Sequence, residues 1–321
     1  MRDAAVLLHG LLMGPSMNLV AFVVPLLLAW LGVRAAQALF ARMERDPVWL
    51  ASAAAAALCA PGALACWYAL HMATDGFLTA PPMPWWHDLL SDAPPLVAVA
   101  LIARAAVRFA ARVVEAAQLR RSTIAPSERL AQAAARCGMA ARELPNDDAV
   151  CFLIGIVRPL VVVSSGTLAR LDDAQLTAAL LHERAHRRRH DVLCAAVVAF
   201  FLDCAPLPLG TTLETYYRAR ELAADRSTAR ETTPETLATA LMVFARAALR
   251  SPAGVHAAAL GETAALPARL QALLVPQPDD AAVPARRAAV ALLLAALPLL
   301  VEYRVAAHAA GMALMRAYGI M

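Results

Sequence analysis

The chain has 321 residues, of which 60% are hydrophobic and only 17% are charged, and its formal net charge is +4. A soluble domain usually carries about 25% charged residues, so this composition argues against an ordinary soluble protein and predicts membrane spans. The small net charge gives no indication of direct nucleic-acid binding.

Two long apolar runs near the N-terminal end predict membrane-spanning helices. Residues 17–39 and Val48–Ala73 each reach the roughly 20 apolar residues that cross a bilayer. The next segment, residues 74–95, holds prolines, acids and the pair Trp85–Trp86. Because tryptophan favours the headgroup level of a membrane, we expect an interfacial loop there.

A third, weaker apolar run starts near Pro95. It carries a stripe of arginines spaced by four, which therefore share one helix face: Arg104, Arg108 and Arg112. Arginines are costly in lipid unless they reach the interface or face protein. We therefore expect a third span whose inner half emerges into the cytoplasm with this stripe.

These runs divide the chain into three regions. Residues 1–119 form a membrane domain with three transmembrane helices, and residues 120–286, which hold most of the acids, form one soluble domain. Residues 287–321 contain the apolar run Ala288–Val301, which we expect to form a tilted fourth span. Arginines flank the first and third runs, whereas the loop between the second and third runs has none. This asymmetry predicts an outside N-terminus and a cytoplasmic soluble domain.

The soluble domain contains the sequence LHERAHRRRHD within a helix predicted over residues 174–191. The acidic pair Asp172–Asp173 precedes it, where an N-cap and the helix dipole favour negative charge. His182 and His186 project from one face, one turn apart, and two imidazoles so placed can bind one Zn²⁺. Glu183 lies one step round the helix, which suits a catalytic glutamate that does not bind the metal. The alternative is a charged surface helix that happens to contain histidines.

A catalytic zinc needs a third protein ligand and an open coordination position. The downstream sequence YYRARELAADRSTA offers Glu221 as that ligand. Asp225, four residues later on the same helical face, could orient a ligand histidine. The alternative for this segment is an exposed helix with i,i+4 charges. The apolar run Val192–Leu202 between the two motifs is too short to span, so we expect a core helix or an interfacial one.

Two β-rich runs precede the zinc helix, Ala149–Ile154 and Leu160–Ser164. We expect two strands, separated by Gly155 and Pro159. An edge strand beside a zinc site can bind an extended peptide by strand addition, and Leu160–Ser164 is our candidate for it. A small sheet with only a structural role is equally compatible.

The segments GIVRPLVVVSSG, LDDAQLTAALLHERAHRRRHD and RARELAADRSTA together resemble the membrane zinc peptidases of the BlaR/MecR type. The resemblance implies an α-helical polytopic membrane protein with a mostly α, α+β zincin-like metallopeptidase domain carrying a small sheet. It also implies one Zn²⁺ and gluzincin-type cleavage of a cytoplasmic protein at the inner membrane of a bacterium. The residues that match the family's motif are the ligands His182, His186 and Glu221, the catalytic Glu183 and the outer-shell Asp225.

The implied substrate is a protein or peptide, in this group a transcriptional repressor. The sequence has no counterpart of the extracellular penicillin-binding domain of the β-lactam sensors, so we expect no direct β-lactam sensing. One alternative is a quality-control protease of the heat-shock or prenyl-protein type, which shares HExxH and ExxxD. Another is a signalling transducer with little general proteolytic activity. Candidates for the oxyanion-stabilising residue are Tyr216, Tyr217 and His190.

Overall fold

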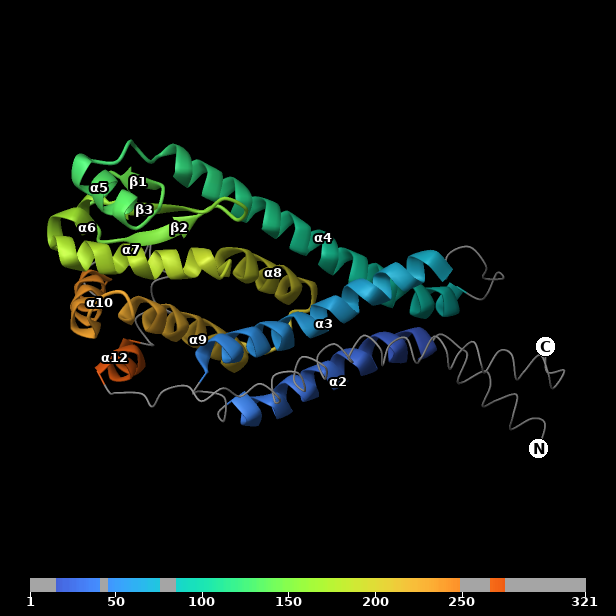
Figure 1. Ribbon diagram of the computed structural model, residues 1–321. Helices are drawn as coiled ribbons and strands as arrows, with labels where there is room; N and C mark the ends of the chain where they lie inside the picture. The colour runs from blue at the N-terminus through green and yellow to red at the C-terminus, as the bar shows by residue number, and fades with distance from the viewer. Residues whose placement is uncertain (1–15, 41–45, 76–84, 249–265, 275–321) are drawn as a thin grey trace, which may run out of the picture.

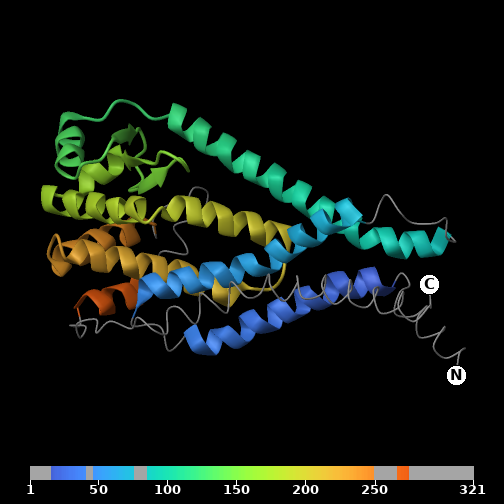
Figure 2. The ribbon, with the colours of Figure 1, turned by 45° about the vertical axis from the view of Figure 1, so that its right-hand side comes forward.

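The computed structural model describes residues 16–40, 46–75, 85–248 and 266–274. The described part is mostly helical and carries one three-stranded sheet. The sheet lies at one end of the molecule, and three long helices extend toward the other end (Figures 1 and 2). These are α2 (Ser16–Phe40), α3 (Pro47–Asp75) and α4 (Trp85–Arg121). The predicted span Ala288–Val301 lies outside the described residues.

Helices α2 and α3 coincide with the first two apolar runs of the sequence. In the described part, Pro47–Leu70 is the one segment that is long and apolar enough to cross a membrane, and Phe22–Gln37 is a shorter apolar stretch. Both helices expose large apolar side chains, among them Leu28 and Leu70. Exposed side chains of this kind suit contact with lipid better than contact with water.

The start of α4 corrects one prediction. We expected an interfacial loop up to residue 95, but the helix begins at Trp85 and continues through Pro94 and Pro95. Proline lacks an N–H donor and ordinarily ends a helix, which is why the sequence suggested a boundary there. Helices α2 and α3 also contain an internal proline each, as membrane helices commonly do.

The sheet has the strand order β1-β3-β2, with β1 (Ala141–Leu144) parallel to β3 (Leu160–Ser164) and β2 (Cys151–Ile154) antiparallel to it. The prediction that Leu160–Ser164 is an edge strand was therefore wrong, because β3 is central and buried along its length. The sequence also missed β1, a four-residue strand whose charged side chains give no apolar pattern. Gly155, at φ +102°, supplies the left-handed backbone that the turn between β2 and β3 requires.

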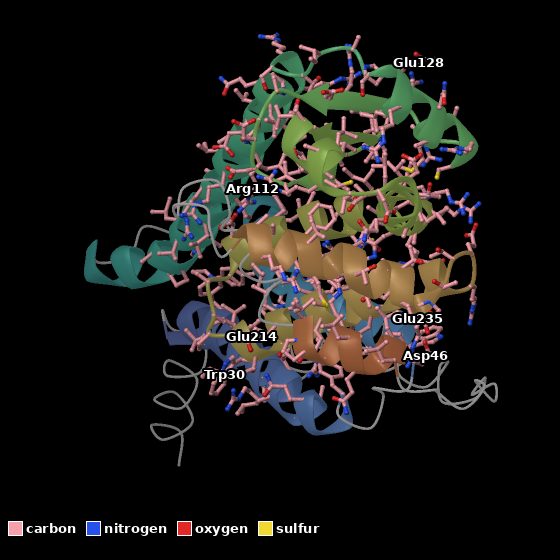
Figure 3. The ribbon with its side chains drawn as sticks, turned by 90° about the vertical axis from the view of Figure 1, so that its left-hand side faces the viewer. Trp30, Asp46, Arg112, Glu128, Glu214 and Glu235 are labelled. Carbon is pink, nitrogen blue, oxygen red and sulfur yellow. The ribbon has the colours of Figure 1, made fainter. Side chains whose placement is uncertain are left out.

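The sheet places its two faces against different helices. Val161 and Val163 join a core with α5 (Glu128–Arg136) and α7 (Asp173–Arg188), while Val162 and Leu160 face a smaller cluster that includes Ala116 of α4. This alternation explains why a strand that is buried on both faces is almost continuously apolar. The short helix α6 (Ser165–Arg170) directly follows β3. Figure 3 looks at the molecule from this end.

The remaining helices complete the core on the other side of α7. They are α8 (Asp191–Cys204), α9 (Gly210–Ala229), α10 (Pro234–Ala248) and α12 (Leu266–Leu274). The apolar run Val192–Leu202 is helical and lies within α8; Val198 is buried, whereas Leu193 and Val197 are exposed, so the core and the interfacial alternatives both stay predictions. Both α8 and α9 contact α3, and Val198 and Tyr216 share one apolar cluster with Leu50 and Leu58. Apolar contacts thus cross the boundary predicted near residue 120.

Candidate metal centre

Helix α7 presents the HExxH sequence to the core of the molecule. Its N-terminus has a capping box, in which Asp172 accepts from the backbone of Gln175 and the Gln175 side chain accepts from the backbone of Asp172. Leu176 and Leu180 are fully buried on the face that packs against β3. The predicted N-cap is confirmed, and it fixes the register in which His182 and His186 point inward.

The helix ends earlier than we predicted. It stops at Arg188, and His190 takes a left-handed conformation with φ 55°. This break turns the chain back so that Asp191 starts α8 beside the histidines. The sequence pattern could not indicate this end, because the run of arginines has good helix propensity.

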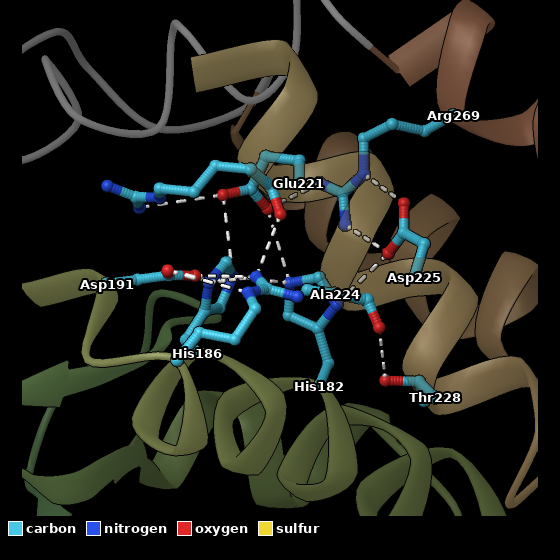
Figure 4. Close-up of polar contacts among 10 residues, drawn as sticks. His182, His186, Asp191, Glu221, Ala224, Asp225, Thr228 and Arg269 are labelled. Carbon is cyan, nitrogen blue, oxygen red and sulfur yellow. Dashed lines mark hydrogen bonds and ion pairs between the residues drawn. The ribbon is translucent and has the colours of Figure 1, made fainter. Parts of the chain in front are cut away.

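Three side chains converge from α7 and α9: His182, His186 and Glu221. Their potential ligand atoms all lie within 4.8 Å of one another, and all three residues are buried. The two Nε2 atoms are 3.1 Å apart, and Glu221 Oε2 lies 3.2 Å from His182 Nε2 (Figure 4). The structure therefore brings together the three residues that the sequence predicted as zinc ligands, from segments separated by the whole of α8.

Each histidine has a carboxylate at its other ring nitrogen. Asp225 Oδ1 lies 3.0 Å from His182 Nδ1, and Asp191 Oδ2 lies 2.6 Å from His186 Nδ1. Because a carboxylate only accepts, the proton of each neutral imidazole lies on Nδ1, which leaves the lone pair of Nε2 for a metal; without metal, Nε2 of His182 carries a proton as well. Two imidazole nitrogens and one carboxylate, oriented in this way, form a donor set that suits Zn²⁺.

The sequence pointed to Asp225 but gave no role to Asp191. Asp191 ends the basic run that follows HExxH, and that position is the signal that could have identified it. It is 7% exposed, and Arg189 donates to it as well as to the backbone carbonyl of Arg220. Arg189 thus ties the start of α8 to α9 directly beside His186.

Arg269 is a second residue that the sequence did not reveal. Its Nε and Nη2 donate to the two oxygens of Asp225 at 2.7 and 2.8 Å, and its Nη1 lies 3.4 Å from Glu221 Oε2. The side chain is buried, on α12. No local spacing links Arg269 to the zinc motifs, because it lies 44 residues beyond Asp225 in the chain.

The charged groups of this cluster shift one another's pKa values. Burial opposes a charge on Glu221, but the imidazoles of His186 and His182 outweigh it and hold the pKa of Glu221 well below its ordinary value. Burial likewise opposes a charge on His182, yet hydrogen bonds with Asp225 and Glu221 raise its pKa to about 10. Without metal, an imidazolium thus compensates the buried carboxylates, and a divalent cation would take over that role.

Glu183 lines a cavity of about 420 Å³ together with the three converging side chains. Burial raises the pKa of Glu183, as the nearby Glu221 also does, although His186 and His182 oppose this rise. A raised pKa makes the carboxylate a stronger base toward water. The rest of the cavity wall is largely apolar and comes from β2, α10 and the starts of α8 and α12, with Phe152 and Phe244 among its residues.

The three candidates for oxyanion stabilisation do not line this cavity among the described residues. Tyr216 is buried in the cluster shared with α3, whereas Tyr217 and His190 are exposed. Arg220 does line the cavity, with its guanidinium over the rings of both tyrosines. Arg220 thus supplies a side-chain cation on this wall in addition to Arg269, and its Nη2 lies 3.6 Å from Glu221 Oε1.

Comparison with known families gives one match. The family model described as BlaR1 peptidase M56 matches residues 95–273, which is more than half of the chain. The matched stretch includes α7, α8, α9 and all but the last residue of α12, and hence every residue of the candidate metal centre. No curated protein gives a significant match.

Proposed function

We propose that this chain, which belongs to the BlaR1 peptidase M56 family, is a zinc-dependent endopeptidase held in a membrane. Family membership assigns a metallopeptidase. The observation that supports the zinc chemistry is the convergence of His182, His186 and Glu221 beside Glu183 in one cavity. In this assignment the first three residues bind one Zn²⁺, and Asp225 and Asp191 orient the two imidazoles.

Bound zinc supplies a Lewis acid that polarises the scissile carbonyl and makes water more acidic. Glu183 accepts a proton from the attacking water and then delivers it to the leaving amide nitrogen. Glu183 is half-buried and lines the cavity, but it is not one of the three side chains that converge on the candidate metal position. The presence of Glu183 argues against a scaffold that only transmits signals, because such a scaffold has no need of a carboxylate there.

The substrate is a protein that presents an extended segment, and β2 is the strand that suits it. In the described part, β2 is an outer strand of the sheet, and residues 150–153 line the cavity beside Glu183. A peptide added to this edge gains affinity from main-chain hydrogen bonds, so its side-chain selectivity is modest. The apolar wall around the strand favours apolar side chains near the cleaved bond. Resemblance to the BlaR/MecR type suggests a cytoplasmic transcriptional repressor.

The proposed location is the cytoplasmic membrane of a bacterium, with several spans and a cytoplasmic peptidase region. Two observations support it: the apolar helices α2 and α3 with exposed side chains, and the arginines that flank α2 and α4 but are missing between α3 and α4. Nucleic acid is not a direct partner. A quality-control protease of the heat-shock or prenyl-protein type is the second assignment, and the family match favours the first.

The purified full-length chain tests this function. We expect one zinc per chain, and endoproteolytic cleavage of a disordered protein substrate that stops when a chelator removes the metal and resumes when zinc is restored. Mass spectrometry of the products would locate internal cleavage sites. Cleavage that a chelator leaves unchanged, or release of terminal residues only, would contradict a zinc endopeptidase.

A further inference from the structure

We propose that the arginine stripe of α4 is a binding site for the headgroup of an anionic phospholipid. The site consists of Arg104, Arg108 and Arg112, gathered around Asp203 near the end of α8. This inference rests on the membrane location given in the proposed function. It concerns residues distant from the metal centre and does not depend on peptidase activity.

The carboxylate of Asp203 holds the three guanidinium groups together. Arg108 Nη1 and Arg112 Nη2 each donate to it at 2.8 Å, and Arg104 Nη2 lies 3.7 Å away. The Asp203 side chain is only 8% exposed. A stripe that merely marked a membrane flank would need no buried carboxylate on a neighbouring helix. Asp203 instead draws the stripe into the junction between α4 and α8, where Figure 3 labels Arg112.

The cluster keeps an excess of positive charge and accessible donors. Three guanidinium groups face one carboxylate, which leaves a net charge of two, and their side chains are 41%, 55% and 43% exposed for Arg104, Arg108 and Arg112. Each guanidinium has five N–H donors in a planar fork, so one or two contacts with Asp203 leave donors for another anion. Phosphate is the anion that such forks bind bidentately.

The surroundings of the cluster are apolar, which favours a lipid over a soluble phosphate. Leu96, Val97 and Val99 precede it on α4 and are 58%, 48% and 53% exposed, and Val197 of α8 is also exposed. Acyl chains would cover this surface while the headgroup meets the arginines. Basic pockets between helices on the cytoplasmic side are a recurring form of anionic lipid site.

The stripe begins where the apolar part of α4 ends. The eight residues 96–103 are all apolar, and Arg104 follows them directly. Arginine side chains at the end of an apolar helical segment extend to the headgroup level of a membrane.

Lipid binding to the full-length protein in detergent micelles tests the site. Native mass spectrometry would compare bound phosphatidylglycerol with bound phosphatidylcholine as each is titrated. We expect a preference for phosphatidylglycerol that glycerol phosphate in solution does not compete away. In the variant Arg104→Gln, Arg108→Gln, Arg112→Gln we expect the phosphatidylglycerol affinity to fall on the order of tenfold or more.

A matched triple variant distinguishes binding at this site from a general effect of the protein's positive charge. Arg136→Gln, Arg142→Gln, Arg158→Gln removes the same charge from exposed arginines elsewhere and should keep the preference. The single variant Arg104→Gln controls for misfolding, because it keeps both hydrogen bonds to Asp203, those from Arg108 and Arg112. We expect it to weaken phosphatidylglycerol binding several-fold.

Equal binding of both lipids, competition by glycerol phosphate, or equal losses in the two triple variants would overturn the site. A chain that alkaline carbonate extracts from native membranes would instead contradict the proposed membrane location.

Discussion

Among single residues, the charges around Glu221 would control how the proposed site binds metal. Asp225, Asp191 and Glu221 are all buried, and the buried Arg269 neutralises only part of their charge. The imidazolium of His182 supplies further positive charge in the metal-free protein. A proton and a metal therefore compete for the same nitrogen.

This competition predicts a steep pH dependence of zinc affinity. The pKa of His182 is raised to about 10 in the folded, metal-free protein, so at pH 7 zinc must displace a proton. We expect the zinc affinity to rise by about tenfold or more per pH unit between roughly pH 6.5 and 9. Competition with a chromophoric chelator at several pH values would measure it, and an affinity that does not change with pH would refute the charge assignment.

The raised pKa of His182 also makes the free energy of unfolding of the metal-free protein depend on pH. Between the unfolded pKa near 6.5 and the folded pKa of about 10, the folded chain holds a proton that the unfolded chain has lost. The stabilisation from His182 is therefore complete below about pH 6.5 and declines as the pH rises toward 10. Zinc removes this decline, because the metal takes the place of the proton.

A site residue could be predicted from the sequence only where it lies close along the chain to another residue of the site. His182, His186, Glu221 and Asp225 could be found because helical i,i+4 spacing places each pair on one face. Arg269 could not, because only tertiary packing of α12 brings it to Asp225. The contact of Asp191 with His186 depends on the left-handed turn at His190, which the sequence does not indicate.

Among the helices and strands, the contact between α3 and α8 links the membrane-type helices to the peptidase region. Gly62 lies where the two backbones approach: a Cβ at this position would be 2.1 Å from the carbonyl oxygen of Phe201. A contact this close needs a residue without a side chain.

Gly62→Ala is therefore expected to separate α3 from α8 and to lower the stability of the protein. Overpacking of this kind costs about 1–3 kcal/mol or more. Gly32→Ala is the matched control, since a Cβ at Gly32 of α2 meets nothing within 4 Å. In thermal unfolding in detergent, Gly62→Ala should lower the Tm, and Gly32→Ala should leave it unchanged or raise it. Equal Tm values for the two variants would show that the close approach is not needed.

Helices were easier to predict than strands in this chain. The long apolar runs of α2 and α3 and the motif helices α7 and α9 carry strong local patterns. The four residues of β1 do not, because the strand exists only through its pairing with β3. The same pairing makes β3 central and leaves β2 as the outer strand to which we assign peptide binding, a consequence of tertiary structure that no local pattern contains.

At the scale of the whole molecule, the apolar N-terminal helices and the peptidase region share one core. Val198, Leu209 and Tyr216 of the peptidase region pack with Leu50 and residues of α2. A fragment of residues 120–286 would expose that surface to solvent. Movement of the N-terminal helices could also be transmitted through α8 to Asp191, which contacts His186.

We expect this fragment to aggregate or to cleave substrate much more slowly than the full-length chain in detergent. The physical reason is the loss of the apolar contacts of α3 with α8 and α9. Size-exclusion chromatography and cleavage rates per bound zinc would compare the two. If the fragment is monomeric, binds zinc and cleaves at the full-length rate, the N-terminal helices serve only as an anchor.

The central claim is that His182, His186 and Glu221 bind a catalytic zinc and that Glu183 moves the proton. The most direct test measures zinc content and cleavage rate together in two variants of the full-length chain. Glu183→Gln should keep its zinc but lose at least about 100-fold in rate, because general acid–base catalysis is typically worth 10²–10⁴-fold. His186→Ala should lose both metal and activity, while Glu214→Gln, on an exposed face of α9, should keep both. Cleavage by Glu183→Gln at the wild-type rate would contradict the account.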